Sequence, residues 1–182
     1  FHALPTDISV SSIFSSLGDN AEYIIAEGAG AINQSGNWYG SLQTITAHDA
    51  YWLIIDEDAV LTILEAVPTS LGENNLEYDL HFGNNLISYP FSAGQDINEA
   101  MDESFLNSIF AIAGSGEAAQ YVNGIWYGSL DYLNPSAGYW MVAYEDVEFQ
   151  FNQPDYDAPP RNSSGSRNDA PDLFTFNQSP YQ

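Results

Sequence analysis

The side chains best suited to chemistry in this sequence are carboxylates and aromatic rings. The chain of 182 residues carries 25 Asp and Glu against 2 Lys and Arg, and 14% of its residues are aromatic. Carboxylates bind hard cations such as Ca²⁺, which takes about six to eight oxygen ligands. Exposed aromatic rings provide large contact surfaces for ligands or other proteins. Metal binding and surface recognition are therefore the first chemistries to weigh.

Two acidic turns supply the candidate calcium ligands. The run Asp56-Glu57-Asp58 stands between two expected strands, and Glu145-Asp146 stands at the corresponding place later in the chain. The spacing of an EF-hand loop is absent, and acidic clusters commonly serve only to keep a surface solvated. We therefore predict no resident cofactor. Ca²⁺ is the one candidate ion, at Asp56, Asp58, Glu145 and Asp146.

Residues that could catalyse a reaction lack a recognisable frame. The chain has no cysteine, which removes thiolate nucleophiles and disulfides together. Its three histidines, His2, His48 and His81, lie in separate segments without ligand spacing. The run GSGEA around Ser115 lacks the flanking pattern of a nucleophile elbow. The sequence thus predicts that the chain is not an enzyme.

The charge balance limits the partners. The formal net charge is −23, and the two cations, Arg161 and Arg167, both lie near the end of the sequence. Nucleic-acid binding needs Lys and Arg to displace counterions, and anionic membranes attract basic segments. No apolar run is long enough to span a bilayer. We predict no nucleic-acid partner and no membrane insertion, which leaves cations, neutral glycans or further copies of the chain.

A near-repeat organises the chain. GNWYGSL at 36–42 returns as GIWYGSL at 124–130, and a shift of 88 residues carries Trp38 onto Trp126 and Trp52 onto Trp140. Two tandem copies of one small unit are the expected architecture. The predicted boundaries are 1–66 for copy one, 67–78 for a linker, 79–151 for copy two, and 152–182 for a tail rich in Pro, Ser and Asn.

Each copy reads as one short helix followed by strands. In copy one, Val10, Ile13 and Phe14 have helical spacing, with Ser9 or Asp7 as the N-cap. In copy two we expect the helix to run through Ala100 and Met101, capped by Asp96 or Asn98. The last strands are expected at Val60–Leu64 and Val147–Phe151. The predicted fold class is α+β, mostly β, with one short helix in each copy.

The aromatic residues allow two interpretations. Small domains need large rings to fill their core, so the tryptophans are expected inside. Strand alternation then turns the neighbouring tyrosines outward, where they can form a platform for neutral sugars. The candidate glycan-binding residues are Tyr39, Tyr127, Tyr121 and Tyr132.

Copy one has no counterpart to the first strand of copy two, Asp79–Ser88, because Phe1 aligns with Tyr89. An absent strand leaves unpaired backbone groups on its neighbour. Three explanations stay open: the strand belongs to a longer chain, a neighbouring copy donates it, or the alternating segment 172–176 fills the gap. The predicted assembly edge comprises Phe1, His2, Ala3, Leu4, Leu173, Phe174 and Phe176.

The segments GNNLISYPF, WYGSL and NPSAGYW resemble repeated modules of bacterial extracellular proteins that read GWNLIS, a central Trp, and PGKGYW. The resemblance covers 1–65 and 79–151, although Ala137 or Asp49 replaces the Lys of that motif. It implies small β-rich modules of secreted, cell-surface or marine particle-surface chains, with a structural or adhesive role. We therefore expect a non-catalytic extracellular repeat whose copies pair through strand edges into a filament or array, with glycan binding as the alternative.

Overall fold

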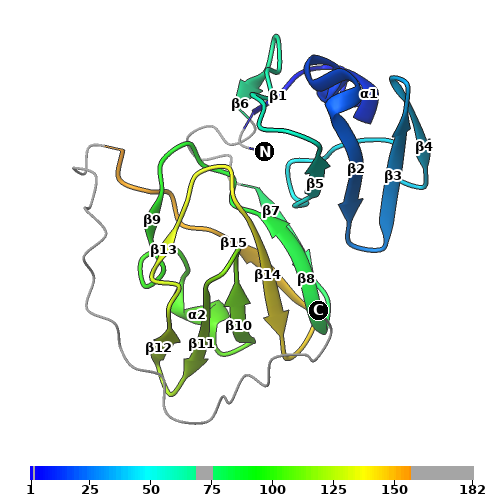
Figure 1. Ribbon diagram of the computed structural model, residues 1–182. Helices are drawn as coiled ribbons and strands as arrows, with labels where there is room; N and C mark the ends of the chain where they lie inside the picture. The colour runs from blue at the N-terminus through cyan, green and yellow to red at the C-terminus, as the bar shows by residue number, and fades with distance from the viewer. Residues whose placement is uncertain (2, 69–75, 157–182) are drawn as a thin grey trace.

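Figure 1 shows a computed structural model of the chain, which describes residues 1, 3–68 and 76–156. Strands dominate the described part and form several antiparallel sheets, accompanied by three short helices. The predicted fold class, α+β with mostly strand, is confirmed. Within the described residues, no helix has the length and apolar character needed to cross a membrane.

The N-terminal half, residues 3–68, is built on a four-stranded antiparallel sheet in the order β4-β3-β2-β5. The hairpin between β3 and β4 turns through Ser35 and Gly36, whose φ angles are 52° and 82°. Positive φ at both central residues is what a two-residue type I′ turn requires. The strands are β2 (Ala21–Ala26), β3 (Ala29–Gln34), β4 (Asn37–Gly40) and β5 (Trp52–Ile55).

The C-terminal half, residues 76–156, contains a five-stranded antiparallel sheet in the order β12-β11-β10-β14-β8. Its β11–β12 hairpin turns through Asn123 and Gly124, again with positive φ at both residues. The strands are β8 (Gly83–Ser88), β10 (Ile109–Ala113), β11 (Ala118–Val122), β12 (Ile125–Gly128) and β14 (Gly138–Ala143).

Backbone pairing in the two sheets follows one register at a shift of 88 residues. Tyr23 pairs with Ile32 in the first sheet, and Ala111 pairs with Gln120 in the second. Both central strands, β2 and β10, carry an irregularity at their start where they meet β5 and β14. Within the part of the chain that the structure describes, strand β8 has no equivalent beside β5.

A glycine ends each Trp-Tyr-Gly strand for a steric reason. Gly40 has φ 152° and Gly128 has φ 148°, a region that L side chains rarely adopt. A Cβ on Gly40 would lie 2.7 Å from Cα of Ala31, and one on Gly128 would lie 2.8 Å from Cα of Ala119. Both sites therefore admit only hydrogen, because the neighbouring strand approaches so closely.

The remaining elements are short. Ser9 caps α1 by accepting a hydrogen bond from the Ser12 amide, as one of the two sequence alternatives predicts. The second helix differs from its prediction, because Asp102 accepts from the Ser104 amide and the helix begins after Met101. These elements are β1 (Ala3–Leu4), α1 (Val10–Ile13), η1 (Ser15–Asn20), β6 (Val67–Pro68), β7 (Glu77–Leu80), β9 (Gln95–Asp96), α2 (Glu103–Leu106), β13 (Tyr132–Leu133) and β15 (Val147–Gln150).

Each half has its own hydrophobic core. The N-terminal core is built around α1, η1 and the inner face of the four-stranded sheet, with Ile13 and Ile24 fully buried. The C-terminal core is larger and rich in aromatic rings, and its Phe149 and Phe151 rings lie 4.7 Å apart. Leu76 packs against both cores.

The last predicted strand of the N-terminal half does not form. Residues 60–64 are irregular, and Val60 and Leu64 are exposed, whereas the corresponding strand β15 pairs with β7. The described N-terminal half has no counterpart of β7, so residues 60–64 pair with no described strand. The Thr62 amide instead donates a hydrogen bond to the Ser16 hydroxyl at 3.0 Å. Residues 67–68, predicted as linker, instead pair as β6 with β1.

Candidate functional site

The outer face of the four-stranded sheet is apolar and exposed. Strand pairing aligns Tyr39, Ile32, Tyr23 and Ile54 across the four strands in one row, and Ile25 with Trp52 in the next. Exposed fractions run from 42% for Tyr23 to 56% for Tyr39, and Ile32 is half-buried. We call this set the outer face: Tyr23, Ile25, Ile32, Tyr39, Trp52 and Ile54.

The six matching positions of the five-stranded sheet are less exposed than those of the outer face. At the positions of Tyr23, Ile25 and Ile32 it carries two alanines and a glutamine, in the same strand register. Contiguous exposed apolar patches on a soluble protein mark interaction sites, whereas scattered single residues do not. All six residues at these positions are half-buried: Ala111, Ala113, Gln120, Tyr127, Trp140 and Val142.

Strand β5 presents an open edge beside the outer face. In the other sheet, β8 pairs with β14 along its whole length, from Gly138 to Ala143. The amides of Leu86 and Ser88 point away from β14. The alternate residues of β8, Gly83, Asn85 and Ile87, therefore bond to β14. Met141 and Ala143 pair with Asn85 and Gly83, so their amides point toward β8. At the matching positions, the amides of Leu53 and Ile55 point outward, and within the described residues no strand pairs with them.

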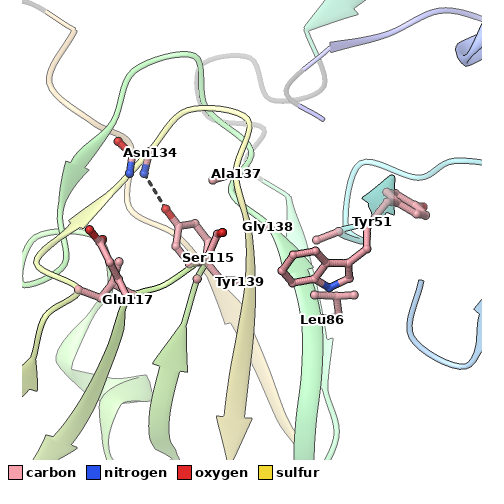
Figure 2. A pocket seen from close by; sticks show the side chains of 12 residues that line it. Tyr51, Leu86, Ser115, Glu117, Asn134, Ala137, Gly138 and Tyr139 are labelled. Carbon is pink, nitrogen blue, oxygen red and sulfur yellow. Dashed lines mark hydrogen bonds between the residues drawn. The ribbon is translucent and has the colours of Figure 1, made fainter. Parts of the chain in front are cut away.

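A cleft of about 300 Å³ lies where the two halves meet. Figure 2 shows Tyr51 on one wall and Tyr139, Glu117 and Asn134 on the other. The phenol oxygen of Tyr139 accepts a hydrogen bond of 2.7 Å from the Asn134 amide. In the N-terminal half, the phenol of Tyr51 accepts one of 2.8 Å from the Thr46 amide.

The cleft has the chemistry of a binding site. Burial raises the pKa of Tyr139 and that of Tyr51, so both phenols keep their protons in neutral solution. Glu117 is its one carboxylate, and no His lines it. Sugar hydrolysis needs a second carboxylate, so these side chains can contact a ligand but do not form an acid–base pair.

The two halves are joined along β8. The amide of Ala50 donates to the Leu86 carbonyl at 3.2 Å, and the amide of Ser88 donates to the His48 carbonyl at 2.8 Å. A side chain on Gly138 would collide with that of Ala50. Strand β8 therefore lies between β14 on one side and residues 48–50 on the other, with Asp49 bridged to Ile87.

A histidine–carboxylate contact strengthens this junction. One carboxylate oxygen of Glu27 accepts a hydrogen bond of 2.8 Å from the Leu86 amide. The other lies 2.9 Å from Nε2 of His81. Nδ1 of His81 lies 2.8 Å from the Phe82 carbonyl oxygen. Because both ring nitrogens face acceptors, the protonated imidazolium satisfies both contacts. The Phe82 carbonyl and then Glu27 raise the pKa of His81.

A second groove, about 280 Å³, contains a predicted sugar-binding residue. Tyr39 and Trp38 supply aromatic surface, and the neutral polar side chains Ser11, Asn37 and Gln43 line the rest. Gln43 donates to the Gly40 carbonyl at 2.7 Å, which fixes its amide beside the rings. Aromatic surface combined with neutral hydrogen-bonding groups suits a neutral sugar.

The other predicted sugar-binding tyrosines do not join Tyr39. Tyr121, Tyr127 and Tyr132 lie in the C-terminal half and are half-buried. The ring of Tyr121 lies 5.1 Å from that of Trp126, which is itself buried as predicted. The expectation that tryptophans fill the interior is wrong for Trp52, which is 48% exposed.

The predicted calcium ligands lie in two separate turns, and among the described residues no three metal-ligating side chains form a cluster. Glu145 accepts a hydrogen bond from the Ser108 hydroxyl at 2.7 Å. Asp146 accepts one from the Phe82 amide at 2.8 Å. These carboxylates therefore hold turns together. The four predicted residues are Asp56, Asp58, Glu145 and Asp146.

Three residues of the predicted assembly edge make contacts within the chain. Ala3 and Leu4 pair with Pro68 and Val67 within the chain, and the ring of Phe1 packs against Phe14 and Tyr51. Among the described residues, the outer edge of β5 is paired with no strand. The predicted residues outside the described part of the chain are His2, Leu173, Phe174 and Phe176.

Sequence reasoning missed most of the outer face. Tyr23, Ile25, Ile32 and Ile54 belong to strands that alternate, and either face of a strand can be the buried one. A signal was present, because a shift of 88 residues places Ile32 against the polar Gln120. Comparing the two copies position by position for apolar bulk would have identified the face.

No protein-family model, curated protein or solved structure matches the chain. The likeness to bacterial extracellular modules therefore stays a prediction from sequence, and function is argued from the geometry of the described residues.

Proposed function

We propose that the chain is a non-catalytic structural or adhesive module of a secreted, cell-surface or particle-surface protein, which assembles through an open strand edge. The observation that supports this is the outer edge of β5, with which no described strand pairs, whereas the matching edge of β14 is occupied by β8. Exposed edges are templates for pairing with another chain. In strand addition, main-chain hydrogen bonds provide affinity and side-chain pockets provide specificity.

We further infer that the two halves are copies of one unit. Supporting this are the common register, the two positive-φ hairpin turns and the matching glycines Gly40 and Gly128. Among the described residues, the C-terminal half has a strand in the β8 position and the N-terminal half does not. A strand from a partner would therefore pair with β5 as β8 pairs with β14 in the C-terminal half.

Amide hydrogen exchange tests the edge assembly. The amides of Leu53 and Ile55 should exchange rapidly in dilute solution and become protected as the protein concentration rises. Those of Met141 and Ala143 are the matched controls, since β8 already covers them, and they should be protected at all concentrations. Rapid exchange of Leu53 and Ile55 in the associated protein would overturn the edge assembly.

The groove around Tyr39 supports a second candidate, binding of a neutral glycan. Its test is a glycan array or polysaccharide pull-down with the unmodified chain and with Tyr39→Ala and Asn37→Ala variants. Both substitutions should abolish retention, whereas Tyr144→Ala, at an equally exposed ring on the other half, should not. Retention that survives loss of Tyr39 and Asn37 would remove this candidate.

A further inference from the structure

We propose that the outer face of the four-stranded sheet pairs with the same face of a second copy of this chain. This deepens the proposed function, on which it rests for self-association, but it uses the sheet face where that proposal uses the edge. The two contacts involve different surfaces of β5, one formed by side chains and the other by backbone.

The fold does not require bulky residues at this face. The five-stranded sheet has the same register with Ala111, Ala113 and Gln120 at three of its six positions. Large apolar side chains in the N-terminal sheet therefore contribute little to forming it, and they stand in water at a cost in solubility. Five of the six side chains stay 42–56% exposed, although Trp52 also lines the cleft together with Leu86 and Tyr139 of the C-terminal half. Covering the exposed area requires another molecule.

The size of the face suits a pair of copies. Large aromatic and aliphatic side chains, each about half exposed, leave apolar area on the order of 500 Å² per copy. Two such faces together bury on the order of 1,000 Å², where specific protein interfaces begin. Two sheets packed face to face lie about 10 Å apart, as in a β-sandwich.

The apolar character of the outer face limits charge repulsion between two copies at this position. The chain has a net charge of −23, so two copies repel wherever carboxylates meet. None of the six outer-face residues is a carboxylate, and the adjacent Glu22 and Asp56 interact with each other at the margin of the face. The three isoleucines offer neither a stacking ring nor a hydrogen bond to a sugar. Two copies related by a two-fold axis contact each other through the same surface. The apolar rows of one outer face would therefore pack against the apolar rows of the other.

Sedimentation equilibrium of the full chain tests the pairing. The unmodified protein should show a monomer–dimer equilibrium that tightens with added salt, because salt screens repulsion between the copies. A triple variant, Tyr23→Ala/Ile25→Ala/Ile32→Gln, places the residues of the C-terminal sheet in the N-terminal one. Its dimer dissociation constant should rise at least 100-fold, while its circular dichroism spectrum stays unchanged.

A matched control removes exposed apolar area elsewhere. Phe82→Ala and Val60→Ala delete side chains that are 71% and 82% exposed and lie outside the face. Both should dimerise as the unmodified protein does. A single monomer at millimolar concentration, or a triple variant that dimerises equally well, overturns the face pairing.

The same samples separate this inference from the edge assembly. If the triple variant stays associated and keeps Leu53 and Ile55 amides protected, the edge assembly stands and the face pairing is overturned. If the unmodified protein dimerises with those amides unprotected, and the triple variant does not dimerise, the face pairing stands alone.

Discussion

Replacing either strand-ending glycine with alanine should destabilise the chain far more than replacing a turn glycine. Gly40 and Gly128 combine φ near 150° with no room for a Cβ, whereas Gly36 and Gly124 have φ of 82° and 86° and open space around them. The four positions thus separate backbone strain from steric collision. They also test whether the two sheets obey the same constraint.

The magnitude follows from two contributions. A residue held in a φ region that only glycine favours costs about 1–3 kcal/mol. Forcing a methyl group against a neighbouring strand costs about 1–3 kcal/mol more. We expect Gly40→Ala and Gly128→Ala each to lower the free energy of unfolding by about 2–6 kcal/mol. Gly36→Ala and Gly124→Ala meet no atom within 4 Å, so about 1 kcal/mol is expected.

Urea unfolding followed by tryptophan fluorescence measures the difference. With an m value of about 2 kcal/mol per molar, the midpoints of the strand-ending variants should lie roughly 1–3 M below that of the unmodified chain. The turn variants should shift by about 0.5 M. Equal midpoints for Gly128→Ala and Gly124→Ala would refute the steric reasoning.

Three further changes test the junction, the cores and a helix cap. The pKa of folded His81 is raised above 6.5. Its stabilising contribution should therefore be complete below pH 6.5 and disappear as pH rises through the raised pKa. Urea melts at several pH values measure this decrease in stability, and the His81→Gln variant should not show it. Phe149→Ala should cost about 3–5 kcal/mol, because its ring is fully buried. Ile63→Ala, at a half-buried position of the N-terminal half, should cost clearly less in the same urea melts, and an equal cost would contradict the difference between the cores. Ser9→Ala should cost about 1 kcal/mol in thermal unfolding through loss of the cap on α1; no change would contradict that cap.

The sequence allowed prediction of those features that depend on local chemistry. The alternating and turn residues around Trp38 and Trp126 predicted the mostly β fold, and Ser9 was one of two predicted caps. The helix at Ala100–Met101 was misplaced because Asp96 forms a turn there, accepting the amide of Asn98, instead of capping a helix. The strand at Val60–Leu64 was wrong because a strand also needs a partner, which sequence pattern alone does not supply.

The candidate site was harder to predict than the fold. Tyr39 was identified as an outward-facing residue, but its neighbours across the sheet, Ile32 and Tyr23, were not. Which face of a strand is buried depends on what packs against it. Here the inner face meets α1 and η1. The outer face adjoins other described elements at Trp52, which lines the cleft together with Leu86 and Tyr139. The contact of His81 with Glu27 joins residues far apart in the sequence, and no local pattern signals it.

Hydroxyl-radical footprinting at rising protein concentration tests the central claim, that the outer face is a binding surface, most directly. Oxidation of Tyr23, Tyr39 and Trp52 should fall severalfold as the protein associates. Tyr144, as exposed as Tyr39 but located on the other half, should be oxidised at an unchanged rate. Equal oxidation of the three outer-face residues in the monomeric and associated protein would contradict the account.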